Sequence, residues 1–248
     1  MAVIITGGTG AIGSAMACAF AKTNDVAIIY KSSDENARQL EKELGCKADK
    51  TDVSSAQEVS VAVERIAADF GKIDVLINNA GISQIKLLSD VTELDWYNMV
   101  DVHLTGAFNM TKAVLPFMIS RKQGSIINIS SMNAFRPLTK IPAYSAAKAG
   151  ISNFTEWLAV HFAPCGIRVN AIAPGFFVTN QNRALLFDAD GNPTARTGKI
   201  LAATPQKRFG EVSDLIGTLL WLASDDASGF VTGVIVPVDG GFNAYSGV

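Results

Sequence analysis

Tyr144 and Lys148 are four residues apart, a spacing that puts a phenol and an ammonium group on one face of a helix. A lysine beside a tyrosine favours the phenolate, because a nearby positive charge lowers the pKa of an acid. Such a tyrosine can move a proton to or from an alcohol near neutral pH. Ser131 lies upstream, and its hydroxyl could hydrogen-bond a substrate oxygen as charge develops there. The three residues indicate acid–base chemistry, although a packed tyrosine beside a surface lysine gives the same pattern.

The first thirteen residues combine a short apolar run with a glycine-rich turn. Residues 2–6 suit a buried parallel strand, residues 7–13 contain four glycines, and residues 14–22 predict a helix of small residues. A strand, a glycine turn and a helix in this order form a dinucleotide fingerprint. The glycines let the backbone approach a pyrophosphate, and the helix N-terminus favours its negative charge. The predicted contacts of this segment are Gly7, Thr9, Ile12 and Gly13.

Five motifs together resemble those of short-chain dehydrogenases/reductases along essentially the whole chain. They are Thr6 to Gly13, Asn78-Asn-Ala-Gly81, Ser131, Tyr144 with Lys148, and Pro174-Gly175 with Thr179. The resemblance implies hydride transfer between a nicotinamide and a carbonyl or alcohol carbon. It implies that Tyr144 is the general acid, that Lys148 lowers its pKa and contacts the nicotinamide ribose, and that Ser131 orients the reacting oxygen. The further cofactor contacts that it implies are Asp52, Val53, Asn79, Ala80, Gly81, Tyr144, Pro174, Gly175, Phe177 and Thr179.

Apolar runs and helical stretches alternate along the chain and predict the fold. Strands are expected at 2–6, 26–30, 46–48, 73–78, 125–130, 168–173 and 234–238, and helices at 14–22, 35–44, 56–70, 93–119, 142–162 and 212–223. This alternation predicts an α/β fold, a doubly wound parallel sheet of Rossmann type with right-handed crossovers. One domain over residues 1–248 is expected, with residues 176–209 as a helical substrate lid.

Composition narrows the class of protein. The hydrophobic content of 48% suits a sheet covered on both faces, and the net charge of −2 without basic runs argues against a nucleic-acid partner. No apolar stretch is long enough to span a bilayer, so no membrane partner is expected. The chain starts directly on a strand, without a signal peptide, and its three widely spaced cysteines predict reduced thiols and no metal cluster. A cytoplasmic enzyme acting on a small molecule is expected.

The end of the second predicted strand bears on the choice of cofactor. An acidic residue there usually binds the ribose hydroxyls of NAD, but here Tyr30 is followed by Lys31 and Ser32. A lysine and hydroxyls suit a ribose phosphate, so the sequence favours NADP(H), with contacts from these three residues. NAD(H) stays possible, because Asp34 and Glu35 follow and Lys31 can be an ordinary solvated residue.

Three positions near the predicted cofactor site either depart from the family pattern or allow more than one role. Asp52 matches an adenine contact of the family but could cap the next helix, a role that Ser54 or Ser55 could also fill. Ala11 stands where the family has the second glycine of the turn, and its methyl group narrows the approach to phosphate. His103 stands where members have an asparagine of a water-linked proton path. It can hydrogen-bond there and titrate near neutrality, or simply be a buried packing histidine.

Arginines and amides predict the substrate. The residues expected to reach the cleft are Asn133, Arg136, Lys140, Asn180, Gln181, Asn182 and Arg183, and we predict substrate contacts from Asn133, Arg136, Asn182 and Arg183. Guanidinium groups suit carboxylates and amides suit hydroxyls, so a polyhydroxylated acid fits. A fatty acyl or steroid substrate would need more apolar lid residues, and the arginines could alternatively hold the lid together.

A narrower resemblance supports a sugar acid. Residues 129–248 are similar to D-mannonate (fructuronate) oxidoreductases of this superfamily, above all at residues 131–144, 176–183 and the tail from Asp239. The first half departs, because the segment after Asn78 is the ordinary one of the superfamily. A general carbonyl or polyol reductase is the alternative enzyme, and a non-catalytic nicotinamide-binding sensor is a remote one. The two long helices and the C-terminal strand resemble interfaces that imply a homotetramer.

Overall fold

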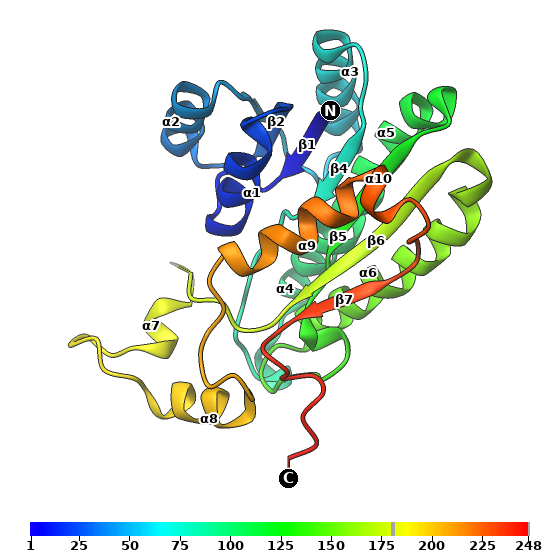
Figure 1. Ribbon diagram of the computed structural model, residues 1–248. Coiled ribbons are helices and arrows are strands. Elements are labelled where there is room, and N and C mark those ends of the chain that lie inside the picture. Colours follow the sequence, from blue (N-terminus) through cyan, green and yellow to red (C-terminus); the bar gives the residue numbers. More distant parts are fainter. Residues whose placement is uncertain (180–181, 248) are drawn as a thin grey trace.

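Seven parallel strands form one twisted sheet in the computed structural model, which describes residues 1–179 and 182–247. The sheet order is β3-β2-β1-β4-β5-β6-β7, so the chain winds outward from β1 in both directions (Figure 1). The strands are β1 Ala2–Thr6, β2 Asp25–Tyr30, β3 Lys47–Lys50, β4 Val75–Asn78, β5 Gly124–Ile129, β6 Ile167–Pro174 and β7 Ile235–Val238. The prediction of a doubly wound parallel sheet is therefore confirmed.

Helices cover both faces of the sheet, which explains the continuous apolar runs of its central strands. On one face Phe20 of α1 (Ala11–Ala21) and Leu219 of α9 (Ser213–Ala223) pack in one core cluster, beside α2 (Asp34–Leu44). The opposite cluster holds the apolar sides of α3, α5 and α6. These helices span Ala56–Phe70, Gly106–Arg121 and Pro142–Phe162, with α4 (Glu93–Val100) preceding α5.

The predicted single helix over residues 93–119 contains a local irregularity. Between α4 and α5 the chain forms a π-helical turn at Asp101–Thr105, where the N–H of Gly106 donates to the carbonyl of Asp101, five residues back. Such insertions often lie at functional sites. Here the turn carries His103, which is buried.

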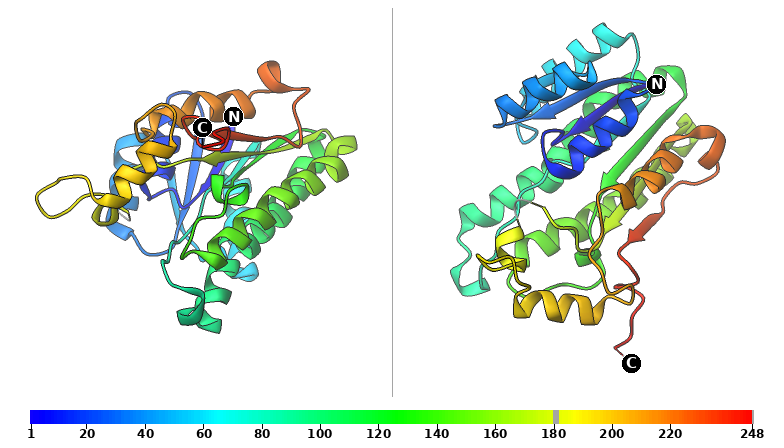
Figure 2. Two further views of the ribbon diagram at one scale, coloured as in Figure 1. Left: turned by 90° about the horizontal axis from the view of Figure 1, so that it is seen from below. Right: turned by 60° about the vertical axis from the view of Figure 1, so that its left-hand side comes forward.

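The segment expected to form a lid projects from one side of the sheet (Figures 1 and 2). It holds two short helices, α7 (Arg183–Leu186) and α8 (Ala195–Ala203), and it returns to the core through a bridge between Phe177 and Gly210. The predicted substrate residues Asn180 and Gln181 lie outside the described residues. Short turns of helix complete the fold at Leu88–Asp90, Met132–Ala134, Ala163–Cys165 and Asp225–Ser228 (α10).

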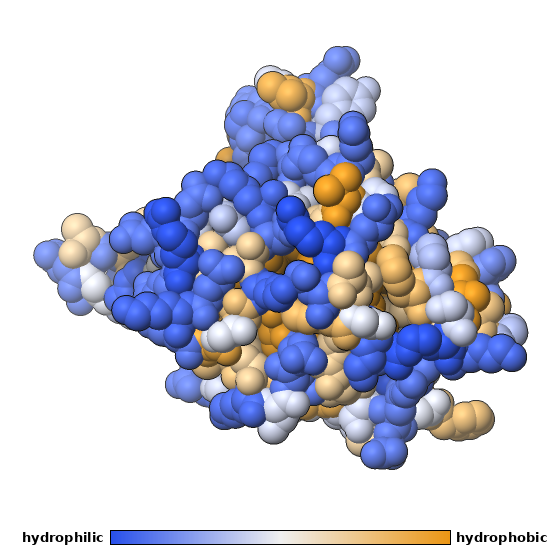
Figure 3. Space-filling view, turned by 90° about the horizontal axis from the view of Figure 1, so that it is seen from above, coloured by the Kyte–Doolittle hydropathy of each residue, from blue (hydrophilic) through white to orange (hydrophobic). Residues whose placement is uncertain are grey.

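The end of the molecule that bears the amino ends of the strands is largely hydrophilic, with apolar residues in separate patches (Figure 3). Among the described residues, no helix combines the length and the apolar character that a bilayer crossing needs. At the other end of the sheet, the carboxyl ends of β1, β4, β5 and β6 meet the loops described below.

Candidate active site

Tyr144 and Lys148 lie in the first two turns of α6, which begins at Pro142, a residue whose fixed φ suits the first turn of a helix. Lys148 is buried, and its Nζ donates a 2.5 Å hydrogen bond to the carbonyl of Ile129 at the end of β5. The same Nζ lies 5.7 Å from the centre of the Tyr144 ring. Burial lowers the pKa of Lys148 to about 7. The ammonium group is thus anchored at the carboxyl end of β5, beside the ring of Tyr144.

The pKa of Tyr144 differs from the expectation. Burial raises it above the ordinary value, and the hydrogen bond with Ser131 opposes that rise. The predicted lowering by Lys148 is not found, because the lysine is itself held by a backbone carbonyl and loses charge on burial. The residue that favours the phenolate in this structure is therefore Ser131.

Ser131 follows β5 and begins the short helical turn Met132–Ala134. Its Oγ accepts hydrogen bonds from the backbone N–H and from the side-chain Nδ2 of Asn133, both at 3.2 Å. The other end of that amide, Oδ1, accepts a hydrogen bond from the N–H of Leu138 at 3.1 Å. Asn133, predicted as a substrate contact, is therefore buried and engaged with its own loop, while Arg136 in the same loop is exposed.

His103 packs directly against the catalytic candidates. Its ring stands edge-on to that of Tyr144 at 5.1 Å, and its Nε2 contacts the backbone carbonyl and N–H of Ile82 at 2.7 and 3.1 Å. Burial, with the nearby Lys148, lowers the pKa of His103 to about 3. The expectation that it titrates near neutrality is therefore wrong, and the residue is a neutral imidazole in the working pH range.

A cavity of about 10 Å³ lies beside Lys148 and His103, lined also by Asn78 and Thr6. Two buried atoms of its lining residues, His103 Nδ1 and Asn78 Oδ1, have no hydrogen-bond partner within the described part of the chain. A volume of this size is close to the smallest that holds one water molecule, which needs two to four polar partners.

The glycine turn after β1 leaves no room for side chains at two of its positions. Gly7 has a φ of +64°, and a Cβ on it would come within 2.9 Å of the Cα of Ala80. A Cβ on Gly13 would overlap the carbonyl oxygen of Gly7, so only glycine fits at the start of α1. Ala11 is the first residue of α1 and is exposed, so its methyl group does not crowd the turn itself.

The predicted cofactor residues Asn79 and Ala80 hold this turn in place. Their backbone N–H groups both donate to Oγ1 of Thr6 at 2.9 Å, and Nδ2 of Asn79 donates to the carbonyls of Thr6 and Gly7. Gly81 packs against His103, where a Cβ would come within 2.6 Å of the ring. Sequence reasoning missed the bracing role of Thr6, whose signal was its place just before the first glycine.

The loops at the carboxyl ends of β2 and β3 contain two ion pairs. Lys31 contacts Asp52 at 2.5 Å, and Lys50 contacts Asp34, which also accepts a hydrogen bond from the hydroxyl of Tyr30. Ser32 is exposed beside them. The cap of α3 is Ser55, which leaves Asp52 beside Val53 at the edge of the site. Lys31, which was predicted to bind a ribose phosphate, is thus already paired with Asp52. This ion pair is weak because it is exposed to solvent.

The loop after β6 joins the site to the lid. A Cβ on Gly175 would come within 2.6 Å of the Cα of Asp239, so the Pro174-Gly175 turn passes close to the end of β7. The amide of Asn182 accepts from the N–H of Thr179 at 2.8 Å and donates to the carbonyl of Phe177 at 2.7 Å, which closes this turn. The guanidinium of Arg183 lies over the ring of Phe187 at 5.5 Å and is exposed.

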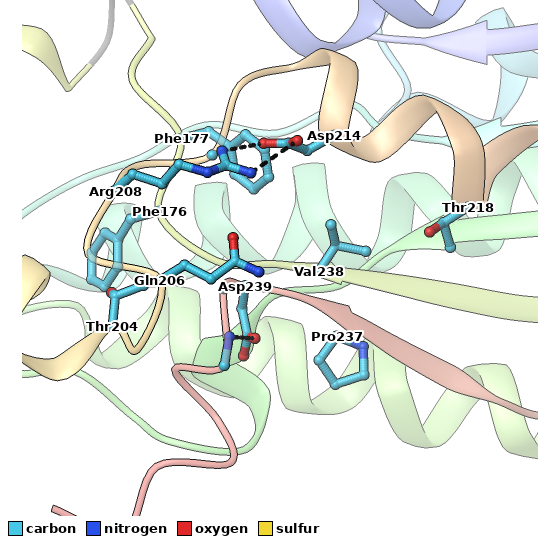
Figure 4. Close-up of a pocket in the computed structure, with 13 residues that line it drawn as sticks. Phe176, Phe177, Thr204, Gln206, Arg208, Asp214, Thr218, Pro237, Val238 and Asp239 are labelled. Carbon is cyan, nitrogen blue, oxygen red and sulfur yellow. Dashed lines mark hydrogen bonds and ion pairs between the residues drawn. The ribbon is translucent and has the colours of Figure 1, made fainter.

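A larger pocket of about 410 Å³ lies between residues 204–210, α9 and β7, and its lining contains none of the four predicted catalytic residues, Ser131, Tyr144, Lys148 and His103. Figure 4 shows its walls: Phe177 lies beside Arg208, which is paired with Asp214 at 2.6 Å, and Asp239 lies below Gln206. Since α9 packs on the face of the sheet opposite α6, this pocket is separate from Tyr144. The candidate active site is the edge that carries Ser131, Tyr144 and the glycine turn.

Comparison with known proteins places this arrangement in a family. A model of the short chain dehydrogenase family matches residues 1–189. The chain is 45% identical to the uncharacterized oxidoreductase UxuB of Bacillus subtilis, over 99% of this chain and 95% of that protein. It is 36% identical to a 3-oxoacyl-[acyl-carrier-protein] reductase of Thermotoga maritima, over 96% of each.

Solved structures agree with this assignment. A candidate D-mannonate oxidoreductase of Haemophilus influenzae with bound NAD superposes with a TM-score of 0.90 at 44% identity, covering 100% of this chain and 96% of the other. A gluconate 5-dehydrogenase of Burkholderia cenocepacia in complex with NADP and tartrate gives a TM-score of 0.89 at 33% identity, over 98% and 95%. The chain therefore belongs to the short chain dehydrogenase family and is an NAD(P)-dependent oxidoreductase.

Proposed function

We propose that the substrate of this oxidoreductase is a sugar acid, a hexonate such as D-mannonate, oxidised at a secondary alcohol to its keto acid or formed from it. The observation that carries the proposal is the 44% identity, over the whole chain, to the Haemophilus protein described as a candidate D-mannonate oxidoreductase. The exposed guanidinium groups of Arg136 and Arg183, on the two loops at the site, support it, because arginine suits a carboxylate.

The proposed chemistry divides among three side chains. The hydroxyl of Tyr144 gives a proton to the substrate oxygen during reduction and takes it back during oxidation. Ser131 donates a hydrogen bond to that oxygen as charge develops on it. Lys148, whose Nζ lies 5.7 Å from the centre of the tyrosine ring, contacts the nicotinamide ribose in this proposal. The nicotinamide supplies the hydride chemistry when it is bound.

The residues around the glycine turn fit such a cofactor. The positive φ of Gly7 and the lack of room for a Cβ at Gly13 leave a backbone cradle that the hydroxyl of Thr6 braces. Asn79, Ala80 and Gly81 flank this cradle, while Pro174, Gly175, Phe177 and Thr179 flank the other end of the proposed cofactor site.

For the choice of cofactor we propose NADP(H), with NAD(H) as the second candidate. Lys31 is 68% exposed at its side chain and its pair with Asp52 is easily exchanged for a ribose phosphate. The bound NAD of the Haemophilus structure favours the second candidate. Replacing Lys31 with alanine should weaken NADP binding about tenfold and leave NAD binding unchanged. Equal affinities of the variant and the wild type for NADP would remove Lys31 from cofactor choice.

A second candidate activity is the reduction of a plain or acyl ketone. It is favoured by the 36% identity to the acyl-carrier-protein reductase and by the phenylalanines around the lid. The deciding experiment measures nicotinamide absorbance with D-mannonate, D-gluconate, a plain secondary alcohol and acetoacetyl-CoA, each with the NAD and NADP forms of the cofactor. Selective hexonate turnover supports the sugar acid, and activity on the ketone or alcohol alone refutes it.

A matched pair of variants sharpens this test. Arg136→Ala should raise the KM for the hexonate at least tenfold and leave the KM for a plain alcohol unchanged, because only the hexonate carries a carboxylate. Arg196→Ala, in α8 of the lid, serves as the control for loss of a cation. Equal effects of Arg136→Ala on both substrates would show that the guanidinium supports the loop and does not bind the acid.

A further inference from the structure

The hydrogen bonds around Ser131 restrict which way its hydroxyl proton can point. A serine hydroxyl has one proton and two lone pairs. Oγ of Ser131 already accepts from the backbone N–H of Asn133 and from its side-chain Nδ2. With both lone pairs engaged, the hydroxyl has only its proton left for any further partner.

The orientation of the Asn133 amide is fixed independently. Its oxygen accepts from the N–H of Leu138 at 3.1 Å, and a backbone N–H can only donate. The end that faces Ser131 must therefore be the NH₂ group, which can only donate as well. Asn133 is buried, with 7% of its surface exposed, so water does not compete freely for these contacts.

The remaining partner of the Ser131 hydroxyl is Tyr144, the proposed acid. We propose that Asn133 is a positioning residue that sets the polarity of Ser131, so that the serine always donates its proton toward the tyrosine and the reacting oxygen and never accepts there. The inference rests on the roles proposed above for Ser131 and Tyr144. It gives Asn133 a function other than substrate contact.

The polarity has a chemical consequence. A fixed donor stabilises negative charge, either on the phenolate of Tyr144 or on a substrate oxygen that becomes an alkoxide. A hydroxyl free to rotate would spend part of its time with a lone pair toward that charge, which destabilises it. The amide of Asn133 also closes the loop over residues 133–138, so the exposed Arg136 and the orientation of Ser131 depend on the same side chain.

The decisive variant is Asn133→Asp, which keeps an oxygen for Leu138 and replaces the NH₂ group with a second acceptor. The Ser131 hydroxyl should then donate to the carboxylate and turn its proton away from Tyr144. We expect kcat to fall about 10²-fold, close to the effect of Ser131→Ala, because either change removes one donor to the developing charge. Asn133→Ala frees one lone pair without adding an acceptor, so its loss should be smaller, about three- to tenfold.

A double-mutant cycle separates positioning from structural support. In the Ser131→Ala background, both changes at Asn133 should lower kcat by no more than about twofold. Asn98→Asp, on the exposed side of α4, is the control for an added charge and should keep wild-type kcat. Assays use D-mannonate, or the plain secondary alcohol if hexonates are not turned over. If Asn133→Asp does not fold, Asn133→Ala in both backgrounds decides the same question.

Each result bears on a different claim. Wild-type kcat in Asn133→Asp, with Ser131→Ala impaired, would overturn the positioning role and leave the proposed mechanism intact. The positioning role would also be overturned if the changes at Asn133 lowered kcat just as much in the Ser131→Ala background and lowered the melting temperature as well. Asn133 would then act by supporting its loop. Full activity of Ser131→Ala would overturn the proposed role of the serine itself, and the inference with it.

Discussion

At the scale of single residues, the proposed chemistry depends on a tyrosine whose surroundings oppose its ionisation. Burial raises the pKa of Tyr144, and Lys148 is bonded to a backbone carbonyl 5.7 Å from the ring centre. The hydrogen bond with Ser131 is the contact among the described residues that favours the phenolate. The tyrosine therefore suits the role of proton donor, the role needed when a carbonyl is reduced.

Tyr144→Phe removes that proton without changing the packing of the ring. Turnover in either direction should fall about 10²- to 10⁴-fold, the usual share of a general acid. Cofactor affinity should change little, since the glycine turn lies on β1 and α1. Kinetics with D-mannonate and fluorescence titration with NADPH and NADH provide the two measurements. Near-normal turnover would exclude Tyr144 as the acid.

His103 predicts a pH dependence of stability. Its pKa is about 3 in the folded protein and about 6.5 in the unfolded chain. Between these values the unfolded state binds one more proton, so the free energy of unfolding falls by about 1.4 kcal/mol for each pH unit below 6.5. The pKa of Lys148, lowered to about 7, makes stability change with pH only above that pH, because below it the lysine is protonated in both states.

His103→Asn should therefore flatten the loss of stability between pH 6.5 and 4.5. Urea unfolding at several pH values measures it, with His161→Asn as the control, since the chain has two histidines and His161 is exposed. An identical slope in wild type and His103→Asn would mean that water reaches the imidazole and that His103 is protonated in the folded protein.

At the scale of elements, the glycine turn between β1 and α1 is the most restricted backbone of the site. Gly13→Ala would push a methyl group into the carbonyl of Gly7 and should abolish detectable binding of NADPH and NADH. Gly217→Ala, on the exposed side of α9 with open space around it, is the matched control. It should bind both cofactors normally and raise the free energy of unfolding by about 0.5–1 kcal/mol. Normal cofactor binding by Gly13→Ala would exclude this turn as the phosphate site.

Local pattern was sufficient to predict most of these elements. The helices at Ala56–Phe70 and Pro142–Phe162 begin and end where the sequence predicts, because a serine cap and a proline mark their starts. The strand expected at 46–48 lies instead at Lys47–Lys50, since this edge strand lacks a continuous apolar run and its register depends on pairing with β2. The π-helical turn at His103 has no local signal, because it depends on tertiary packing, in which the turn and α4 both contact α6.

The site follows the same division. Ser131, Tyr144 and Lys148 could be predicted because each occurs in a recognisable motif. The partners of Asn133, His103 and Lys31 could not, because they are set by contacts between segments or across a loop: Leu138 for the asparagine, Ile82 for the histidine and Asp52 for the lysine. From residue type alone, Asn133, His103 and Lys31 were predicted to contact ligands. In the structure, each of these side chains contacts another residue of the chain.

At the scale of the whole molecule, large apolar side chains remain exposed on the helices that cover one face of the sheet. Trp157 and Val160 of α6 are 56% and 80% exposed, and Phe108 of α5 is 46% exposed. Trp157 stacks on Phe154 and on His161, which makes a ridge of aromatic rings along α6. Exposed apolar surface of this kind usually marks an interaction site. We propose that α5 and α6 pair with the same helices of a second copy, as one interface of a homotetramer.

Val160→Asp tests this interface, because a carboxylate at its most exposed apolar position would be buried against a second copy without a partner. Sedimentation should show a tetramer for the wild type. The variant should sediment as a dimer if a second interface persists, and as a monomer if that interface fails with the first. Val61→Asp, the same change at an exposed valine of α3, is the control and should sediment like the wild type. Since Tyr144 lies on the same helix as Val160, a dissociated variant should also lose melting temperature and turnover together. A wild type that sediments as a monomer would mean that the exposed aromatic ridge serves another partner or none.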